Sequence, residues 1–356
     1  MKVKSGFDRL RDVMRKNNLD WVVLLRYVYN SEPLMDYLLE QNTDESLLLV
    51  TKRKAFLFAS PLVIDALKCR NDVILVSCRS VMEELGRMAS RMKKKPRIGV
   101  ASARIPLSFS KRLGRIGRIV SVDEELDSVR EIKEAREVSL LRKAAATTEE
   151  ILSKCFLNFR LFRKETDVKK FLVEEASVFG GTAFEPIVAS GRNSRIPHAR
   201  ALNKPLAPGF CIIDFGVKYK GYHADISRTV YLKKNKNGPS QRELESFRKV
   251  IEARDSSFSA IRVGAKASEV DDRARKILGE KLVHSLGHGV GVEIHEKPFL
   301  RPGSKDVIRE GSVFTLEPAV YEKSFGIRVE DMVFVGEKGA EFISGPQRTL
   351  LLLNIK

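Results

Sequence analysis

Short apolar runs alternate with helical patterns over the first 125 residues of the chain. Each run is rich in Val, Ile, Leu and Phe, which is typical of a buried strand, and the segments between them repeat apolar residues at helical spacing. The predicted strands are 21–25, 46–50, 55–59, 73–77 and 97–100, and the predicted helices are 7–16 and 80–92. Strands that alternate with helices indicate an α/β domain of modest size.

An acidic segment from Val122 to Cys155 follows, and we expect a long helix in it that begins a second domain. Its apolar positions recur at helical spacing, at Val129, Ile132, Val138, Leu141 and Ala145. A chain of 356 residues is longer than a typical single domain. We therefore place a boundary near residue 127, which gives an N-terminal domain of 1–127 and a C-terminal domain of 128–356.

Strand-like segments dominate the second domain, and two helices interrupt them. The strand-like segments are 184–190, 210–217, 223–232, 312–321 and 326–335. One helix is expected to open at Ser240 and the other near Ser268, each with an acidic residue three positions further on (Glu243 and Asp271), as in a capping box. This order of elements predicts an α+β domain with an antiparallel sheet.

With 43% hydrophobic and 31% charged residues, the chain has the composition of a folded globular protein rather than a disordered one. Its formal net charge is +18, and from Arg87 to Arg118 eleven Lys or Arg occur without any Asp or Glu. Such a segment is typical either of a surface that binds nucleic acid or another anionic partner, or of a solvated basic face. No DNA- or RNA-binding motif accompanies it, so we expect no specific nucleic-acid binding.

The four cysteines are scattered and show no C-x-x-C spacing, which argues against a disulfide framework and against a cysteine-based metal site. They are Cys69, Cys78, Cys155 and Cys211. No apolar run approaches the roughly 18 residues that span a bilayer, and the N-terminus lacks the apolar core of a signal peptide. These features predict a cytoplasmic protein that is not embedded in a membrane.

Two aspartates flank a predicted hairpin whose turn lies at Lys220 and Gly221. Asp214 follows two apolar residues, where a buried strand would usually carry another, and Asp225 lies on the returning strand. Two carboxylates that face each other from paired strands repel unless a cation lies between them. The alternative is that both side chains are exposed and solvated.

Two glutamates repeat this pattern. Glu317 interrupts the apolar run VFTL just before Pro318, and Glu330 follows GIRV, with Arg328 two residues earlier on the same face. A carboxylate at a core-facing strand position is costly unless it is paired or bound to a metal ion. The acidic residues therefore predict a cation site.

Three of the five histidines lie in the stretch HSLGHGVGVEIHEKP, residues 284–298. Its glycines allow tight bends and a close approach of the backbone to a site. The acidic residues and one imidazole together form a ligand set of carboxylate oxygens with a single nitrogen. Such a set suits Mn²⁺, Co²⁺, Fe²⁺ or Zn²⁺ in a two-metal site better than a cysteine-rich structural zinc site.

Five motifs occur in order: IVASGRNSRIPHA, IIDFGVKYKGYHADISRTV, HSLGHGVGVEIHEKP, FTLEPAVY and GIRVED. With them, the chain from about residue 128 to its end resembles the pita-bread-fold metallopeptidases, which include methionine aminopeptidase, aminopeptidase P and prolidase. The preceding N-terminal half makes the whole similar to the two-domain prolidases and aminopeptidases P. By motif position, the resemblance implies five metal ligands: Asp214, Asp225, His288, Glu317 and Glu330.

The resemblance also implies an activity, namely hydrolysis of Xaa-Pro bonds in short proline-containing peptides by a homodimeric exopeptidase with two divalent ions. Glu317 would be both a ligand and the group that takes and returns a proton. His295 and one metal ion would stabilise the oxyanion, and His198 would position the substrate or relay a proton to the leaving proline nitrogen. Arg328 would orient the ligand carboxylates through a charge-assisted hydrogen bond. His284 is expected to have a structural role or to contact a ligand residue, rather than to bind a metal itself.

Some positions depart from the family pattern. Prolidases often carry an arginine directly after the His-Glu-x-Pro element, where this chain has Phe299, with Arg301 two residues later. This difference leaves both an Xaa-Pro dipeptidase and an Xaa-Pro aminopeptidase open. The segment 26–41 replaces an N-terminal pattern that is common in relatives, and Ala319 replaces a usual glycine.

Another class of function is an inactive pita-bread protein that acts as a nucleic-acid or protein binding module. Members of that class have lost their metal ligands, whereas all five ligand positions are kept here. The remaining histidine, His223, is expected to be a packed polar group.

Overall fold

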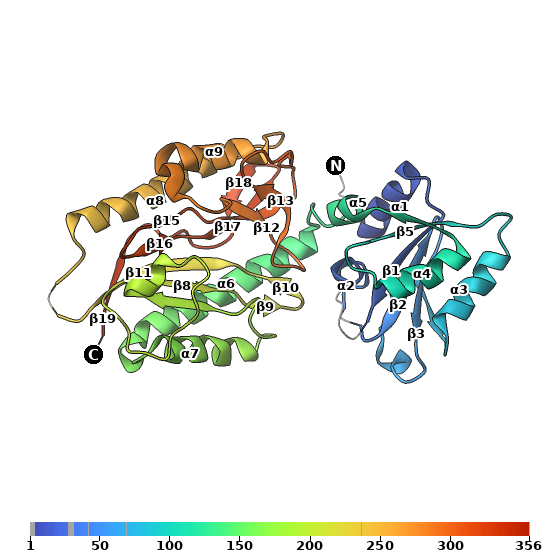
Figure 1. Cartoon of the computed structure of the whole chain (residues 1–356), viewed down its shortest axis with the longest axis horizontal. Helices are drawn as coiled ribbons and strands as arrows, with labels where there is room; N and C mark the ends of the chain where they lie inside the picture. Colours follow the sequence, from blue (N-terminus) through green and yellow to red (C-terminus); the bar gives the residue numbers. More distant parts are fainter. Residues whose placement is uncertain (1–3, 28–31, 42, 69, 236, 356) are drawn as a thin grey trace. The chain divides into compact units, whose positions relative to one another are not determined.

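The computed structural model divides the chain into two compact units, Met1–Arg130 and Glu131–Lys356 (Figure 1). The described residues are 4–27, 32–41, 43–68, 70–235 and 237–355. Two features of the sequence, Cys69 and residues 28–31 of the atypical N-terminal segment, lie outside them.

The first unit contains one sheet with helices on both faces (Figure 1). Its helices are α1 (Gly6–Lys16), α2 (Pro33–Leu39), α3 (Val81–Ser90), α4 (Leu107–Ile116), α5 (Asp123–Ser128) and the 3-10 turn η1 (Ile64–Ala66). Its strands are β1 (Trp21–Arg26), β2 (Ser46–Thr51), β3 (Ala55–Ala59), β4 (Val73–Ser77), β5 (Arg97–Val100) and β6 (Arg118–Ser121).

The sheet of the first unit has the order β4-β3-β2-β1-β5-β6, and β2 alone runs antiparallel to its neighbours. Trp21 and Val23 of β1 pack in one core cluster with Leu85 of α3 and Leu113 of α4. Side chains alternate along a strand, so the buried Val22 lies on the opposite face. The prediction of five strands in an α/β domain is confirmed, and β6 is an additional strand.

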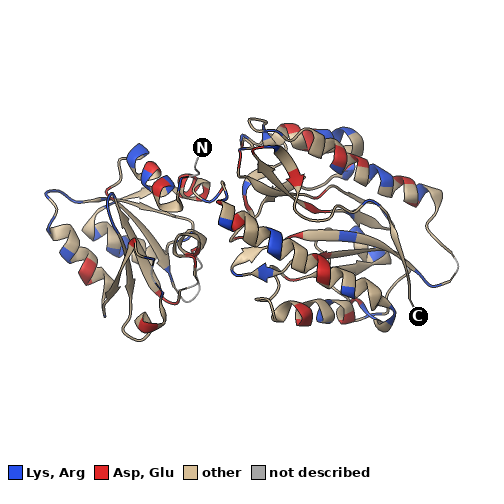
Figure 2. Ribbon diagram, turned by 180° about the vertical axis from the view of Figure 1, so that it is seen from behind, with Lys and Arg blue, Asp and Glu red and all other residues tan. Residues whose placement is uncertain are grey.

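Most of the basic residues between Arg87 and Arg118 lie exposed on this unit, on α3, α4, β6 and the 91–95 turn. Arg87 pairs with Glu84 at 2.8 Å, and Arg104 pairs with Asp127 at 3.5 Å. Figure 2 shows that Lys and Arg are also spread over the helices and loops of the second unit. The distribution fits a generally basic protein with solvated surface charges.

The second unit contains two main sheets, each covered by a pair of helices (Figure 1). Its helices are α6 (Ala135–Leu157), α7 (Glu165–Ser177), α8 (Gln241–Ser259) and α9 (Ala267–Leu278), with the 3-10 turns η2 (Phe159–Leu161), η3 (Gly191–Arg195) and η4 (Gly279–Lys281). Its strands are β7 (Ile187–Ser190), β8 (Gly209–Phe215), β9 (Lys218–Tyr219), β10 (Tyr222–His223), β11 (Ile226–Lys233), β12 (Gly287–Gly289), β13 (Glu296–Leu300), β14 (Val313–Leu316), β15 (Ala319–Tyr321), β16 (Gly326–Arg328), β17 (Asp331–Gly336), β18 (Gly339–Phe342) and β19 (Leu351–Asn354).

One sheet has the order β19-β11-β8-β7 and the other the order β13-β12-β14-β17-β18, while β9/β10 and β15/β16 form short hairpins. Helices α6 and α7 bury Leu141 and Leu172 in the core of the first sheet, and α8 and α9 bury Val250 and Val270 in that of the second. All pairings are antiparallel except β11 with β19, which is parallel. The α+β prediction is confirmed, with this one parallel pair as a difference.

The expected long helix after residue 122 is wrong in one respect, because α5 and α6 are separated by residues 129–134. In this gap Ile132 forms an isolated antiparallel bridge with Ser312, and the Lys133 amide donates to Gly311 O at 2.8 Å. Tertiary pairing therefore overrides helical periodicity. A new capping box then restarts the helix, where Glu137 accepts from the Glu134 amide at 2.8 Å.

Of the two capping boxes expected in the second domain, one is present and one is not. Ser240 and Glu243 form the expected capping box at the start of α8. Helix α9 begins at Ala267, close to Ser268 as expected, but its N-cap residue is Lys266, and Asp271 accepts hydrogen bonds from Arg275 and from the Leu286 amide. The capping interpretation of Asp271 is therefore wrong.

Candidate active site and metal centre

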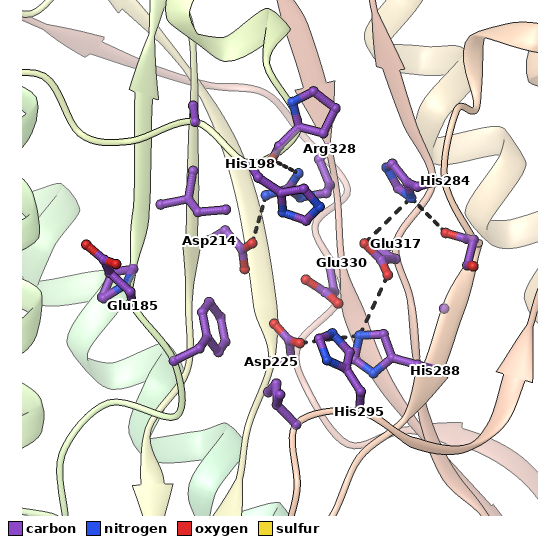
Figure 3. Close-up of a pocket in the computed structure, with 18 of the residues that line it drawn as sticks. Glu185, His198, Asp214, Asp225, His284, His288, His295, Glu317, Arg328 and Glu330 are labelled. Carbon is purple, nitrogen blue, oxygen red and sulfur yellow. Dashed lines mark hydrogen bonds and ion pairs between the residues drawn. The ribbon is translucent and has the colours of Figure 1, made fainter. Parts of the chain in front are cut away.

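One cavity of about 660 Å³ in the second unit is lined by all eight residues that the sequence singles out (Figure 3). They are His198, Asp214, Asp225, His288, His295, Glu317, Arg328 and Glu330. The two main sheets and their connecting segments both contribute to this wall. Residues far apart in the chain are thus brought to one place by the way the sheets meet.

The two aspartates reach the cavity from different kinds of backbone. Asp214 lies in β8, and its cross-strand partner in β11 is Ser227, not Asp225 as expected. Asp225 lies just before β11, in the gap that separates it from β10. The ladder is irregular there because Gly216 passes against the carbonyl of Ala224, where a Cβ would lie 1.7 Å from the oxygen.

The two glutamates lie at breaks in strands that the sequence predicts to be continuous. Glu317 separates β14 from β15, and Glu330 separates β16 from β17. Pro318 cannot donate a ladder hydrogen bond, which favours the first break. The Glu317 amide donates to Leu286 O at 2.7 Å and the Glu330 amide to Ser227 O at 3.1 Å, so both backbones remain anchored.

The glycines around His288 allow β12 to lie tightly between its neighbours. A Cβ on Gly287 would lie 2.0 Å from Thr315 O, and one on Gly289 would lie 2.1 Å from Lys297 O. Real Cβ atoms do not approach carbonyl oxygens so closely, so only glycine fits at both positions. The close packing places His288 opposite Phe299 of β13, with its ring at the cavity.

Asp225, His288 and Glu330 are buried and offer ligand atoms that lie within 4.8 Å of one another. His288 Nε2 lies 3.5 Å from Asp225 Oδ2 and 3.7 Å from Glu317 Oε1. Asp214 Oδ1 is buried and has no hydrogen-bond partner among the described residues. A buried carboxylate oxygen of this kind needs a donor or a cation, so the residues present fit a metal centre.

Burial and mutual repulsion raise the pKa values of the carboxyl groups in this cluster. Burial, followed by the repulsion of Asp214, raises the pKa of Glu330 to about 8. Burial and the charges of Glu330, Asp214 and Glu317 raise the pKa of Asp225 well above its usual range. A bound cation would reverse both effects by favouring the ionised carboxylates.

The histidine of the cluster is held neutral, as a ligand must be. Burial, with a smaller contribution from His295, lowers the pKa of His288 to about 3. Its Nδ1 lies 3.1 Å from Gly289 O, which accepts the ring proton and leaves the lone pair of Nε2 toward the carboxylates. The His295 ring lies 4.3 Å from the His288 ring, edge to face.

Arg328 connects several of these groups. Its guanidinium donates to Asp214 Oδ2 at 2.7 Å and to Ser227 Oγ at 3.0 Å, and Ser227 Oγ in turn donates to Glu330 Oε2 at 3.0 Å. Arg328 also donates to Pro197 O at 2.9 Å, one residue before His198. The contact with Asp214 is a charge-assisted hydrogen bond.

Sequence reasoning missed two polar groups of this network, Ser227 and Tyr321. Tyr321 OH accepts from Arg328 at 2.8 Å and lies 3.2 Å from His284 Nε2. Both are ordinary strand residues in the sequence. Only their positions, two residues after Asp225 and four residues after Glu317, could have drawn attention to them. His284 also lies beside Glu317, with Nδ1 3.8 Å from Oε2.

The profile of metallopeptidase family M24 matches residues 139–337, more than half of the chain. The chain belongs to this family. The match spans all eight of the site residues named above. Metallopeptidases act through divalent metal ions, in agreement with the donor set of the cavity.

Individual relatives and solved structures extend over both units. The chain is 28% identical to an Xaa-Pro dipeptidase of Pyrococcus horikoshii over 96% of this chain and 97% of the relative. It resembles the structure of an Xaa-Pro dipeptidase from Bacillus anthracis with a TM-score of 0.89 at 26% identity, covering 98% and 99% of the two chains. For an X-Pro aminopeptidase from Thermotoga maritima the TM-score is 0.86 at 26% identity, with coverages of 96% and 100%.

Among the described residues, no helix combines the length and apolar character that a membrane span requires.

Proposed function

We propose that this protein is an Xaa-Pro peptidase that works with two divalent metal ions, Mn²⁺, Co²⁺, Fe²⁺ or Zn²⁺. The proposed ligands are Asp214, Asp225, His288, Glu317 and Glu330. The observation that carries the proposal is the convergence of these four carboxylates and one neutral imidazole on a single cavity. The similarity to full-length Xaa-Pro dipeptidases supports the choice of substrate.

When bound, such ions polarise the scissile carbonyl and lower the pKa of a water molecule to about 7. Glu317, whose backbone amide donates to Leu286 O, takes a proton from the attacking water and returns it to the leaving amine. His295 lines the cavity beside His288 and donates to the developing oxyanion. His198 lies exposed on the cavity wall and positions the peptide, and Arg328 holds the Asp214 carboxylate in place.

A dedicated peptidase for Xaa-Pro bonds is chemically reasonable. The tertiary amide before proline has no N–H, and the residue before proline is confined to extended conformations. Enzymes that bind the scissile N–H therefore fail on this bond. A cavity that fixes the carbonyl and the free amino end instead needs no such donor.

The choice between dipeptides and longer peptides depends on what meets the carboxylate of the proline residue. Arg301 lines the cavity, with its guanidinium carbon 5.3 Å from the Phe299 ring centre. Two other cations line the cavity away from Arg328: Lys169, which pairs with Glu185, and the exposed Arg200. We assign Arg301 to the carboxylate of a dipeptide, which favours the Xaa-Pro dipeptidase over the aminopeptidase.

We infer three further properties, which the resemblance suggests. The segment 1–127 is an N-terminal domain of the creatinase and prolidase type, and 128–356 is the catalytic domain. The protein forms a homodimer. It works in the cytoplasm, a location supported by the three described cysteines, Cys78, Cys155 and Cys211, which are all free thiols.

The inactive binding module is not favoured. Such a protein has no need of buried carboxylates around a neutral imidazole, since this arrangement is costly without a cation. Retention of all five positions, with Asp214 Oδ1 left without a hydrogen-bond partner among the described residues, supports a metal-dependent enzyme.

The decisive experiment starts from the full chain stripped of metal with a chelator. Mn²⁺, Co²⁺, Fe²⁺ or Zn²⁺ is added back separately, and each sample is given Ala-Pro and Ala-Pro-Ala. Metal-dependent release of proline from Ala-Pro is expected. Glu317→Gln should reduce the rate at least a hundredfold, whereas Glu337→Gln, an exposed surface change, should leave it unaltered.

The substrate assignment is tested by Arg301→Met. This variant should raise KM for Ala-Pro about tenfold, because it removes a charge-assisted contact to the carboxylate. Cleavage of Ala-Pro-Ala with no cleavage of Ala-Pro would instead make the protein an Xaa-Pro aminopeptidase. Absence of both activities with every metal would overturn the enzyme proposal.

A further inference from the structure

Lys133 and Glu296 form an ion pair deep in the second unit. Lys133 Nζ donates to Glu296 Oε2 at 2.7 Å, and the two side chains are only 1% and 3% exposed. They lie 163 positions apart in the chain. Lys133 lies in the segment that separates α5 from α6, and Glu296 directly follows His295. Neither residue takes part in the proposed chemistry.

The Glu296 carboxylate organises the turn that carries His295. Glu296 Oε1 accepts the Glu293 amide at 2.9 Å, and the Gly291 amide donates to Glu293 O at 3.0 Å. A Cβ on Gly291 would lie 2.7 Å from Glu296 Oε2, so the carboxylate rests against the glycine backbone. The turn 291–296 is therefore wrapped around a carboxylate whose charge is balanced by Lys133.

The other end of the pair is fixed just as firmly. The Lys133 amide donates to Gly311 O at 2.8 Å, and Ile132 bridges to Ser312. Residues 311 and 312 lead directly into β14, which ends one residue before Glu317. Lys133 thus connects the strand that presents Glu317 with the turn that presents His295.

A buried ion pair is seldom the most stabilising way to fill a core, because both charges lose their hydration. An apolar pair could occupy the same volume, but it could not accept the Glu293 amide or fix the direction of the carboxylate. In an active site, a displacement of about 1 Å can lower the rate roughly a hundredfold. Exact positioning can therefore matter more for activity than the free energy of folding that an apolar pair would add. The pair is therefore best explained by the position it imposes on its neighbours.

We propose that Lys133 is a positioning residue that, through Glu296, fixes the turn 291–296 and so holds the His295 imidazole beside His288. The functional part of this proposal rests on the proposed peptidase activity, whereas the structural part does not. Lys133 touches neither substrate nor metal. Its effect is expected in kcat more than in KM, because His295 is assigned to the developing oxyanion.

The test compares Lys133→Met, Lys133→Arg and Glu296→Gln in the full chain. Lys143→Met, an exposed change on α6, is the matched control. In the metal-free protein, hydrogen exchange followed by mass spectrometry should be at least tenfold faster for peptides covering 289–297 in Lys133→Met, with β8 and β11 unchanged. In the metal-loaded enzyme, kcat on Ala-Pro should fall about ten- to a hundredfold with little change in KM. Lys133→Arg should recover part of both effects.

Two results would overturn the proposal. One is unchanged protection of 289–297 in Lys133→Met and Glu296→Gln. The other is a uniform loss of protection over the whole second unit, which would mean that the pair only stabilises the fold. If Lys133→Met does not fold, Glu296→Gln decides, since it keeps the shape of the side chain and removes its charge. The exchange result stands even if Ala-Pro is not a substrate, so failure of the activity and failure of the positioning role remain distinguishable.

Discussion

The site residues carry more negative charge than their protein neighbours can balance. Four carboxylates, Asp214, Asp225, Glu317 and Glu330, share the cavity with one buried guanidinium, Arg328, which is 3% exposed. His288, which lies beside them, is neutral near pH 7, since burial lowers its pKa to about 3. Isolated buried carboxylates cost several kcal/mol, so the cluster is stable only when protonated or when cations are bound.

Replacement of His288 and replacement of His295 are predicted to affect metal binding and catalysis differently. His288→Ala removes the nitrogen ligand and should leave the protein with less than its full metal content after dialysis, with activity lost at limiting metal. His295→Ala should keep the metal and lower kcat/KM for Ala-Pro about a hundredfold, because a single oxyanion donor is worth about 3–4 kcal/mol at most. Metal analysis of the dialysed proteins beside steady-state kinetics separates the two cases.

The exposed Glu337→Gln variant provides the control for both measurements. Equal metal loss in the two histidine variants would contradict the division of roles. Full metal content together with full activity in His295→Ala would remove that residue from the proposed mechanism.

At the scale of elements, the breaks between strands are what make the site. If 312–321 and 326–335 were continuous strands, the alternation of side chains along each strand would alone decide which face Glu317 and Glu330 occupy. Instead β14 and β17 pair in one sheet while β15 and β16 form a separate hairpin, and the glutamates lie where the chain passes from one to the other. Their backbones leave the ladder, and their side chains are free to turn into the cavity.

A second element-scale prediction concerns the start of α5 in the first unit. Asp123 is the first residue of this helix and accepts hydrogen bonds from Ser102 Oγ at 2.7 Å, Ser121 Oγ at 2.5 Å and the Ala103 amide at 2.8 Å. Burial alone would raise the pKa of Asp123, but these bonds outweigh it and lower the pKa to about 2. The folded state therefore holds the ionised form more strongly than the unfolded state does.

Because the pKa of Asp123 falls on folding, from 3.8 to about 2, its stabilising effect is present above pH 4 and is lost as the pH falls through about 2. Asp123→Asn should lower the unfolding free energy of the first unit by about 1 kcal/mol near neutral pH, a value reduced for solvent screening. It should also flatten the acid limb between pH 4 and 2.

Denaturant unfolding at several pH values provides the measurement, with Glu124→Gln on the same helix as control, since that side chain is exposed. A parallel fall of stability with pH in the wild type and in Asp123→Asn would contradict the prediction.

At the scale of the whole molecule, the division into two units makes metal binding a local event. The proposed ligands come from both main sheets of the second unit, so a bound cation links those sheets and relieves the repulsion between their carboxylates. We predict that saturating metal stabilises this unit, by about 2.7 kcal/mol when the free ion is at 100 times its Kd.

Hydrogen exchange with and without chelator gives a residue-level measurement of this effect. Peptides from β8, β11, β12 and β17 should gain protection when metal is added, and peptides from β1, β2 and β3 should not change. Protection that increases equally in both units would contradict a site confined to the second one.

Much of the site could be predicted because its residues are conspicuous in the sequence. Asp214, Glu317 and Glu330 interrupt apolar runs, and His288 lies among glycines, so each departs from its local pattern. Ser227 could not be found in this way, since a serine in a strand breaks no pattern and owes its role to Arg328 and Glu330 on either side.

The fold shows the same division between local and long-range information. Strands β1 to β5 follow from runs of apolar residues, and α8 follows from its capping box. Helix α7 and strand β6 went unpredicted, and the end of the helical pattern at Ile132 depends on a bridge to Ser312 that lies far along the chain. A periodicity reports which face of an element is apolar, not which partner it meets.

By itself, the sequence determined the types of side chain available for chemistry, their spacing along the chain and the membership in a metallopeptidase family. Only the tertiary structure decided that Asp225, His288 and Glu330 offer ligand atoms within 4.8 Å of one another, and that Lys133 reaches Glu296. The reason is physical. Local patterns depend on neighbours in the chain, whereas convergence depends on strand register, where a shift of one residue turns a side chain to the opposite face.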